Sequence, residues 1–462
     1  MKSKMQIQRV IIYCLAVVLF ALVFVGSVMQ SRIGYTSIRT LLALLFELTI
    51  LGGIGYFAVR YAKREMDALG YTRREKTKIG ITLVIFTLLF MLFIILFLSN
   101  ERTIRVYDFS LYWTKVIEDS ELITQSIPEY LARLISSLSE EYGRLPVFAL
   151  LPFSHVFGNG FLAYTLSIYV MYYLPACFFL TLYTARLGKA MGYPKSMLHI
   201  IIVFVAFLLN GQLIFPLLNG YLDVAGVVIF SVILNVSFRW KIYVFDYKQN
   251  IMMAVLSVLL LLTRRWYAYL IVGIYVSQLL VTAVYLIRNK KWNGRAVLHT
   301  ALNICMIGLL SLVIILILNP NVVNMFFANN YTTSYSAYKA VDFGTTVRVA
   351  IERAGILYLL GCAVGLGVLL KNTVTRYTAF RLLLLIIIPF GMFSIVQSFG
   401  GHHYYLFVPT LGILFGCCSF IVIKKLMQEE KMPWFIAFCT IVVFNFCFCY
   451  IQQFGYLQGA MR

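Results

Sequence analysis

The stretch IGITLVIFTLLFMLFIILFL, residues 79–98, decides the fold class. It is apolar from end to end, and it has the length of a bilayer-spanning helix, which needs about 20 residues. A densely basic segment, residues 60–78, precedes it. Similar apolar runs recur through the chain. This pattern predicts an all-α, polytopic transmembrane helix bundle.

The runs predict about thirteen spans. They cover residues 10–29, 38–59, 79–98, 161–185, 197–217, 222–238, 251–262, 268–287, 297–318, 351–370, 382–396, 404–423 and 434–451. The seventh is short, so we expect it either to begin earlier, near Phe245, or to be a broken helix. The basic start followed by an apolar run that is long for a signal peptide predicts a retained first helix.

Composition supports a membrane protein. Of the 462 residues, 61% are hydrophobic and 12% are charged, whereas soluble domains have about 25% charged residues. The net charge of +21 is spread over short loops, which disfavours a nucleic-acid surface. With the N-terminus in the cytoplasm, inner segments hold about twice as many Lys and Arg residues as outer ones, as the positive-inside rule requires.

The nine cysteines all lie inside apolar runs. Their positions indicate packing and argue against a disulfide framework. No Cys or His spacing typical of a metal site is present, so the sequence requires no cofactor.

Two long outer segments are predicted, residues 99–160 and 319–350. In the first, Ser126, Pro128 and Glu129 form a capping-box pattern ahead of an apolar stripe. This helix either lies in the membrane interface or packs on other loops. We divide the chain into an N-terminal part (1–78), a central region (79–423) and a C-terminal part (424–462).

Asp108 follows the third span among aromatic residues. Its carboxylate is suited to act as a general base toward a sugar hydroxyl, and the alternative is an Asp that caps a turn. Tyr107, Tyr112 and Trp113 could stack on a sugar ring or belong to the interfacial aromatic belt.

Arg264 and Arg265 lie at the outer end of the seventh span, beside Trp266, whose ring is a further candidate for contact with the sugar or the acceptor. Arg is suited to a lipid phosphate, and the alternative is snorkelling to head groups. The pair His402 and His403 follows the eleventh span and could orient phosphate or acceptor. Tyr404 adds a ring, and interfacial polar residues are the alternative.

Asp223 opens the sixth span, where a carboxylate is also favoured by the helix dipole, so we assign it at most an accessory role. Glu47 is the acid near a span centre, and its role stays open. The candidates other than Glu47 all fall on the same predicted side.

The order of features resembles the GT-C glycosyltransferases, in particular the protein O-mannosyltransferases and the lipid A aminoarabinose transferase. An outer loop with Asp108 precedes Tyr142-Gly143-Arg144-Leu145-Pro146 and Phe157-Gly158-Asn159-Gly160-Phe161. Phe215-Pro216, Tyr221-Leu222-Asp223 and the segment from His402 to Pro409 follow. The first loop carries one clear acid where relatives have a pair, which puts metal dependence in doubt.

The resemblance implies a GT-C-like fold and transfer of a sugar from a polyprenyl-phosphate donor to a glycan, lipid or protein acceptor. With Asp108 as the base, in-line attack by the acceptor hydroxyl would invert the anomeric carbon. We expect a multi-pass protein of a bacterial cell membrane with an extracytoplasmic active site. A lipid-linked glycan polymerase or ligase, and a polysaccharide transporter or flippase, are the alternatives.

Overall fold

The computed structural model describes residues 36–100, 108–328, 333, 335–339, 341–429 and 432–452. It is helical over 85% of its residues and has no strand in these ranges. The all-α prediction is confirmed. The expected first span, residues 10–29, and Tyr107 lie outside the described residues.

The elements of the first half alternate long helices with short turns. They are α2 (Thr36–Ala68), α3 (Arg73–Asn100), α4 (Asp108–Gln125), α5 (Ile127–Ser136), η2 (Ser137–Ser139), η3 (Leu145–Leu150), α6 (Leu151–Phe157), α7 (Phe161–Ile168), the π-helical η4 (Tyr169–Tyr173), α8 (Leu174–Ala190), α9 (Met197–Leu208), α10 (Gly211–Leu218), α11 (Val224–Val236) and η5 (Ser237–Arg239).

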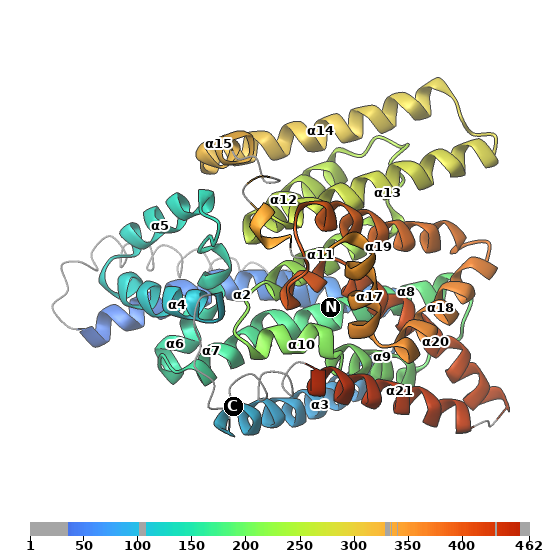
Figure 1. Cartoon of the computed structure of the whole chain (residues 1–462), viewed down its shortest axis with the longest axis horizontal. Helices are drawn as coiled ribbons and strands as arrows, with labels where there is room; N and C mark the ends of the chain where they lie inside the picture. Colours follow the sequence, from blue (N-terminus) through green and yellow to red (C-terminus); the bar gives the residue numbers. More distant parts are fainter. Residues whose placement is uncertain are drawn as a thin grey trace, which may run out of the picture.

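The second half completes the bundle. Its elements are α12 (Tyr247–Thr263), α13 (Tyr267–Arg288), α14 (Gly294–Leu318), α15 (Asn321–Ala328), η6 (Ser336–Tyr338), α17 (Phe343–Ala354), α18 (Ile356–Lys371), α19 (Arg376–Val396), η7 (Gly401–Leu406), α20 (Val408–Glu429) and α21 (Met432–Tyr450). Most of the long helices run roughly along the horizontal axis of Figure 1.

Eight helices among the described residues are long and apolar enough to cross a membrane, or up to ten if each bent pair is one span. Each expected span there coincides with a helix or a bent pair. The count is below thirteen partly because α11 and α12 have only 13 and 17 residues. The seventh span does begin earlier than residue 251, at Tyr247.

The expected span 351–370 is broken. Here α17 and α18 meet at 91°, and Gly355 at the junction has φ 84°. A second break, of 46°, separates α9 from α10. Polar residues lie at both breaks, Asn210 and Gln212 at one and Glu352 and Arg353 at the other.

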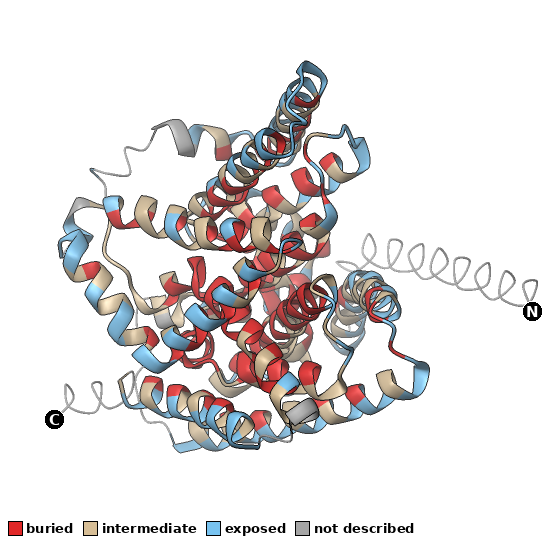
Figure 2. Cartoon of the chain, turned by 90° about the vertical axis from the view of Figure 1, so that its right-hand side faces the viewer, coloured by how far each residue is buried: buried red, intermediate tan, exposed pale blue. Residues whose placement is uncertain are grey.

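The bundle has a buried centre and an exposed periphery, as Figure 2 shows. In α20, 78% of the residues in the apolar window are buried, against 11% in α2 and in α14. Gly365 lets α18 approach α20 closely, because a Cβ there would collide with the Leu414 backbone. The outer helices expose large apolar side chains such as Leu41 and Leu309. An apolar periphery of this extent fits a protein surrounded by lipid.

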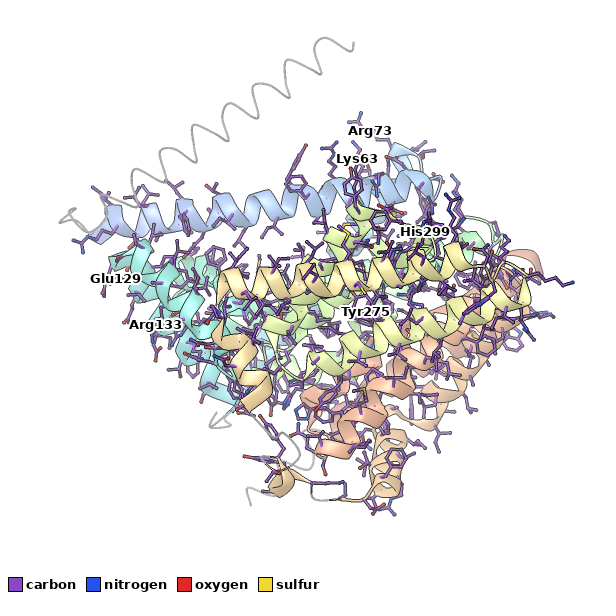
Figure 3. The ribbon with its side chains drawn as sticks, turned by 90° about the horizontal axis from the view of Figure 1, so that it is seen from above. Lys63, Arg73, Glu129, Arg133, Tyr275 and His299 are labelled. Atoms are coloured by element: carbon purple, nitrogen blue, oxygen red, sulfur yellow. The ribbon has the colours of Figure 1, made fainter. Side chains whose placement is uncertain are left out.

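The two ends of the bundle carry different segments. In Figure 3, Lys63 and Arg73 lie toward one end, and Glu129 and Arg133 of α5 lie at the other. The helix α3 (28 residues) connects these ends, as predicted for the segments 60–78 and 99–160. We call the end that carries α4 and α5 the loop end.

Candidate functional site

The first long segment folds into helices of its own at the loop end. Ser126 caps α5 and accepts a hydrogen bond from the Glu129 N–H at 3.3 Å, so the predicted N-cap is confirmed. The Ser126 N–H instead donates to Leu122. Asp108 is the first residue of α4, not part of an irregular loop, and its carboxylate is favoured at a helix N-terminus.

Residues 140–144 are clamped onto α4 by ion pairs. Arg144 binds Glu118 at 2.7 Å and also pairs with Asp119. The hydrogen bond from Arg144 lowers the pKa of Glu118. Lys115 pairs with Glu140 at 3.0 Å and donates to the Tyr142 carbonyl. These contacts fix the position of Tyr142 relative to α4.

Tyr142 joins Asp108 to Arg264. Its hydroxyl donates to Asp108 Oδ1 at 2.6 Å, and the Arg264 guanidinium carbon lies 4.0 Å from the centre of its ring. Burial raises the pKa of Tyr142, so the phenol remains a neutral donor. Asp108 and Arg264 are thus linked through Tyr142, a residue that is not among the candidates chosen from the sequence.

Arg264 is buried and paired. Its Nε lies 2.7 Å from Asp223 Oδ1, and both side chains are at most 5% exposed. The two atoms are close but poorly aligned for a hydrogen bond, and Arg264 Nη1 and Asp223 Oδ2 are buried without a hydrogen-bond partner among the described residues. Arg264 is therefore not a snorkelling residue. We call Asp108, Tyr142, Arg264 and Asp223 the acid–arginine cluster.

Arg265 has a different partner. It pairs with Glu141 at 3.1 Å, and Glu141 also accepts a hydrogen bond of 2.5 Å from Tyr335. Asn319 donates to the Ile135 carbonyl at 3.0 Å. The second long segment therefore packs on the first beside Arg265.

The histidine pair borders the acid–arginine cluster. His402 stacks on Tyr221 with ring centres 4.2 Å apart, and Trp266 lies 5.6 Å from His403, edge to face. Burial raises the pKa of Tyr221, and the Asp108 and Asp223 carboxylates raise it further. Tyr221 therefore lies between the histidine pair and the cluster.

Both histidines are neutral at pH 7. Burial lowers the pKa of His402 and His403 well below the ordinary value, and Arg264 adds to both shifts. The Gly400 N–H donates to His403 Nδ1 at 2.9 Å, which leaves the His403 proton on Nε2. Within the described chain, His402 Nδ1 and Trp266 Nε1 are buried and have no hydrogen-bond partner. These atoms can each offer a single polar contact to a ligand.

Only some of the aromatic candidates lie at the acid–arginine cluster. Tyr112 is 2% exposed and packs edge to face on Tyr142 at 5.8 Å, so protein already covers its ring. Trp113 donates instead to the Asn159 carbonyl at 2.8 Å. Tyr404 lies under Arg353, whose guanidinium carbon is 5.2 Å from the ring centre. The structure thus brings Tyr112 and Trp266 to the site and gives Trp113 and Tyr404 other contacts.

Glu47 has a partner outside this site. The carboxylate is fully buried and lies 3.1 Å from His155 Nε2, which ties α2 to α6. This contact accounts for an acid near a span centre in structural terms.

Comparison with known proteins identifies no relative of this chain. No family model matches the chain, and no curated protein or solved structure matches it.

Proposed function

We propose that this chain is an integral membrane glycosyltransferase that moves a sugar from a polyprenyl-phosphate donor to an extracytoplasmic acceptor. The observation that carries the proposal is the acid–arginine cluster, in which a half-buried carboxylate and a buried guanidinium contact opposite parts of one tyrosine. A base for the acceptor and a cation for the leaving phosphate are the two groups that such a transfer needs.

In the proposed reaction, the acceptor hydroxyl loses its proton to Asp108 while its oxygen bonds to the anomeric carbon. The bond from that carbon to the donor phosphate oxygen breaks, and the phosphate keeps the electron pair. Arg264 or Arg265 stabilises the charge that develops there, and an N–H of the histidine pair or of Trp266 orients the donor. Attack opposite the leaving group inverts the anomeric centre.

The test is transfer of label from a panel of polyprenyl-phosphate sugars to membrane acceptors by the purified protein. We expect Asp108→Asn to lower the rate by about 10²- to 10⁴-fold, the range for removal of a positioned general base. Glu121→Gln removes an exposed carboxylate of the same helix and should leave the rate unchanged. Equal rates for wild type and Asp108→Asn would remove Asp108 as the base.

Tyr142→Phe separates positioning from acid–base chemistry. The variant keeps the ring under Arg264 and removes the hydrogen bond to Asp108. We expect a loss of about tenfold, corresponding to one hydrogen bond to a charged group, together with a shift of the pH profile. A polymerase or ligase, in contrast, would depend on Arg265 and His402 and tolerate both Asp108→Asn and Tyr142→Phe.

A further inference from the structure

A large cavity lies at the end of the bundle opposite the acid–arginine cluster. Its volume is about 1000 Å³. The walls come from the end of α8, the connection 191–196, the start of α9 and the ends of α18 and α20. Helix α20 starts two residues after η7 and ends at the cavity, and its 22 residues span about 33 Å at 1.5 Å per residue. The cavity and the candidate site are therefore on different sides of the bundle.

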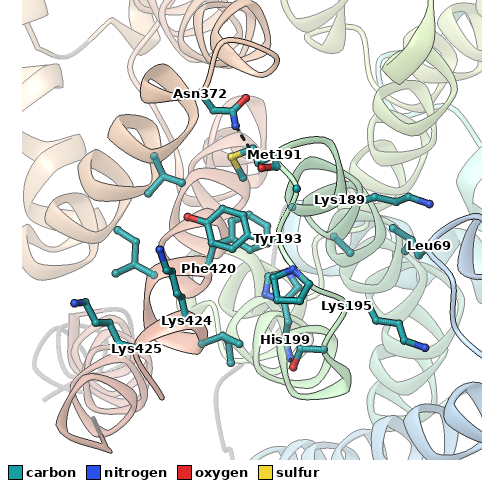
Figure 4. Close-up of a pocket in the computed structure, with 18 of the residues that line it drawn as sticks. Leu69, Lys189, Met191, Tyr193, Lys195, His199, Asn372, Phe420, Lys424 and Lys425 are labelled. Atoms are coloured by element: carbon teal, nitrogen blue, oxygen red, sulfur yellow. Dashed lines mark hydrogen bonds between the residues drawn. The ribbon is translucent and has the colours of Figure 1, made fainter. Parts of the chain in front are cut away.

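Lysines from four separate segments line this cavity, and no Asp or Glu does so among the described residues. They are Lys189, Lys195, Lys371, Lys424 and Lys425. We call it the lysine cavity. Figure 4 shows Lys424 and Lys425 on one side and Lys189 and Lys195 on the other. The wall also includes Asn372, which donates to the Met191 carbonyl at 3.4 Å.

The lysines differ in what they contact. Lys189 donates to the Ala68 carbonyl, and Lys195 pairs with Glu75 at 2.9 Å. Lys371 and Lys424 form no ion pair with a described residue, and both are exposed. Two cations that line a cavity whose described walls hold no acidic residue create a field that favours an anion there.

Three stacked rings lie between Lys424 and Lys425 on one side of the cavity and Lys189 and Lys195 on the other (Figure 4). Phe420 stacks on Tyr193 with ring centres 5.0 Å apart and on His199 at 4.4 Å. These rings provide an apolar surface beside the charges. A ligand that fits both features has an anionic head and an apolar or ring-shaped part.

His199 supplies a buried polar atom in the same wall. The Ser419 hydroxyl donates to the Gly416 carbonyl at 2.6 Å, so it accepts from His199 Nδ1 at 3.0 Å. That contact places the proton on Nδ1. His199 is 6% exposed, and its Nε2 has no hydrogen-bond partner within the described residues. An acceptor nitrogen of this kind suits the hydroxyl of a phosphate monoester, whose second pKa is about 6.

We propose that the lysine cavity binds a phosphate-monoester or diphosphate group, with Lys371 and Lys424 as the cations and His199 as a hydrogen-bond partner. The group belongs either to the head of a membrane lipid or to a soluble phosphate compound. The N-terminus of α9, capped by Ser196 in the wall, adds a further element that favours anions. The proposal does not depend on the sugar-transfer reaction.

The experiment measures binding to the purified full-length protein in nanodiscs. In the lipid arm, phosphatidic acid is titrated into phosphatidylcholine nanodiscs, with the phosphodiester lipid phosphatidylglycerol as comparison. In the soluble arm, pyrophosphate is titrated into phosphatidylcholine nanodiscs by calorimetry. Saturable binding in either arm identifies the source. The absence of saturable binding in both arms overturns the proposal.

The matched variants remove the same charge at different places. Lys371→Gln with Lys424→Gln should weaken binding by about tenfold or more, since each lysine contributes a charged hydrogen bond. Lys290→Gln with Lys291→Gln lowers the net charge equally outside the cavity and should bind as wild type does. Equal weakening in both double variants would reduce the effect to nonspecific attraction and overturn the proposal.

His199→Gln tests the specific role of the imidazole. The variant should lower affinity for phosphatidic acid or pyrophosphate and remove the preference for monoester over diester lipid. Thermal unfolding of this variant is measured in parallel, because the ring also stacks on Phe420. A folded His199→Gln protein that keeps the full preference would exclude His199 from the site.

Discussion

Arg264 carries its charge inside the protein, where the Asp223 carboxylate balances it. A buried ion pair is costly to desolvate, and removing one partner leaves an uncompensated charge. Arg264 therefore both holds α11 against α12 and presents a guanidinium to Tyr142. Its structural and functional contributions can be separated by substituting the two partners singly and together.

Arg264→Met should lower the free energy of unfolding by about 3–5 kcal/mol, because Asp223 is left buried and unpaired. Adding Asp223→Leu should recover most of this loss, since the apolar pair fills the same space. Thermal or denaturant unfolding in detergent measures both effects. A double variant that regains stability but has no transferase activity would assign the Arg264–Asp223 pair to the reaction; one that regains both would leave the pair with a structural role only.

The candidate site could be predicted in part from single residues. Asp108, Arg264, Asp223 and the histidine pair are candidates because of their chemistry and sequence context, and they fall on one predicted side by a topology count that does not use them. Tyr142 was not selected as a site residue, because its contact with Asp108 spans 34 positions and no spacing rule encodes it. The contacts of Trp113 and Tyr404 could not be predicted from the sequence either, since hydropathy does not determine which way a ring faces.

At the scale of elements, α4 was missed although its pattern was present. Tyr112, Val116 and Ile123 are buried, and their spacing of four and seven positions is helical. Charged residues between these three positions interrupt the apolar pattern, so the helix is hard to recognise from hydropathy. The break between α17 and α18 coincides with a change in composition, from Glu352 and Arg353 before Gly355 to an apolar run after it, and the expected span of residues 351–370 ran across this change.

Gly355→Ala tests this break. Gly355 has φ 84° and ψ 130°, a conformation that costs a residue with a side chain about 1–3 kcal/mol. A Cβ would meet nothing closer than 3.6 Å, so the effect is conformational. We expect a lower midpoint of thermal unfolding by the corresponding amount.

Gly367→Ala is the matched control, inside the helix α18 that Gly355 precedes. A Cβ there meets nothing within 4 Å, and Ala is favoured over Gly in a helix by about 1 kcal/mol. The control should be neutral or slightly stabilising. Equal midpoints for Gly355→Ala and Gly367→Ala would show that the bend can straighten without cost.

At the scale of the whole molecule, the sequence predicted the helical class and the positions of nearly every span, because bilayer thickness imposes a length on apolar runs. Within the described residues, eight helices, or up to ten with each bent pair as one span, are long and apolar enough to cross a membrane, so the count of thirteen stays a prediction. Short runs such as α11 are buried against other helices, so protein contact replaces the lipid contact that a hydropathy pattern implies.

The orientation predicted from basic residues can be tested with single cysteines. Lys63→Cys and Glu129→Cys lie toward opposite ends of the bundle (Figure 3). An impermeant maleimide should label Glu129→Cys in intact cells and Lys63→Cys only after permeabilisation, if basic loops face the cytoplasm. The parent chain gives the background from native cysteines. Labelling in the reverse order would invert the orientation and place the acid–arginine cluster inside the cell.

Helix α20 extends from the residues just after the histidine pair to Lys424 in the wall of the lysine cavity. Protein surrounds most of its length, with 78% of the residues in its apolar window buried. The candidate site and the lysine cavity are therefore attached to the two ends of one largely buried helix, so a substitution in its middle should disturb the packing at both.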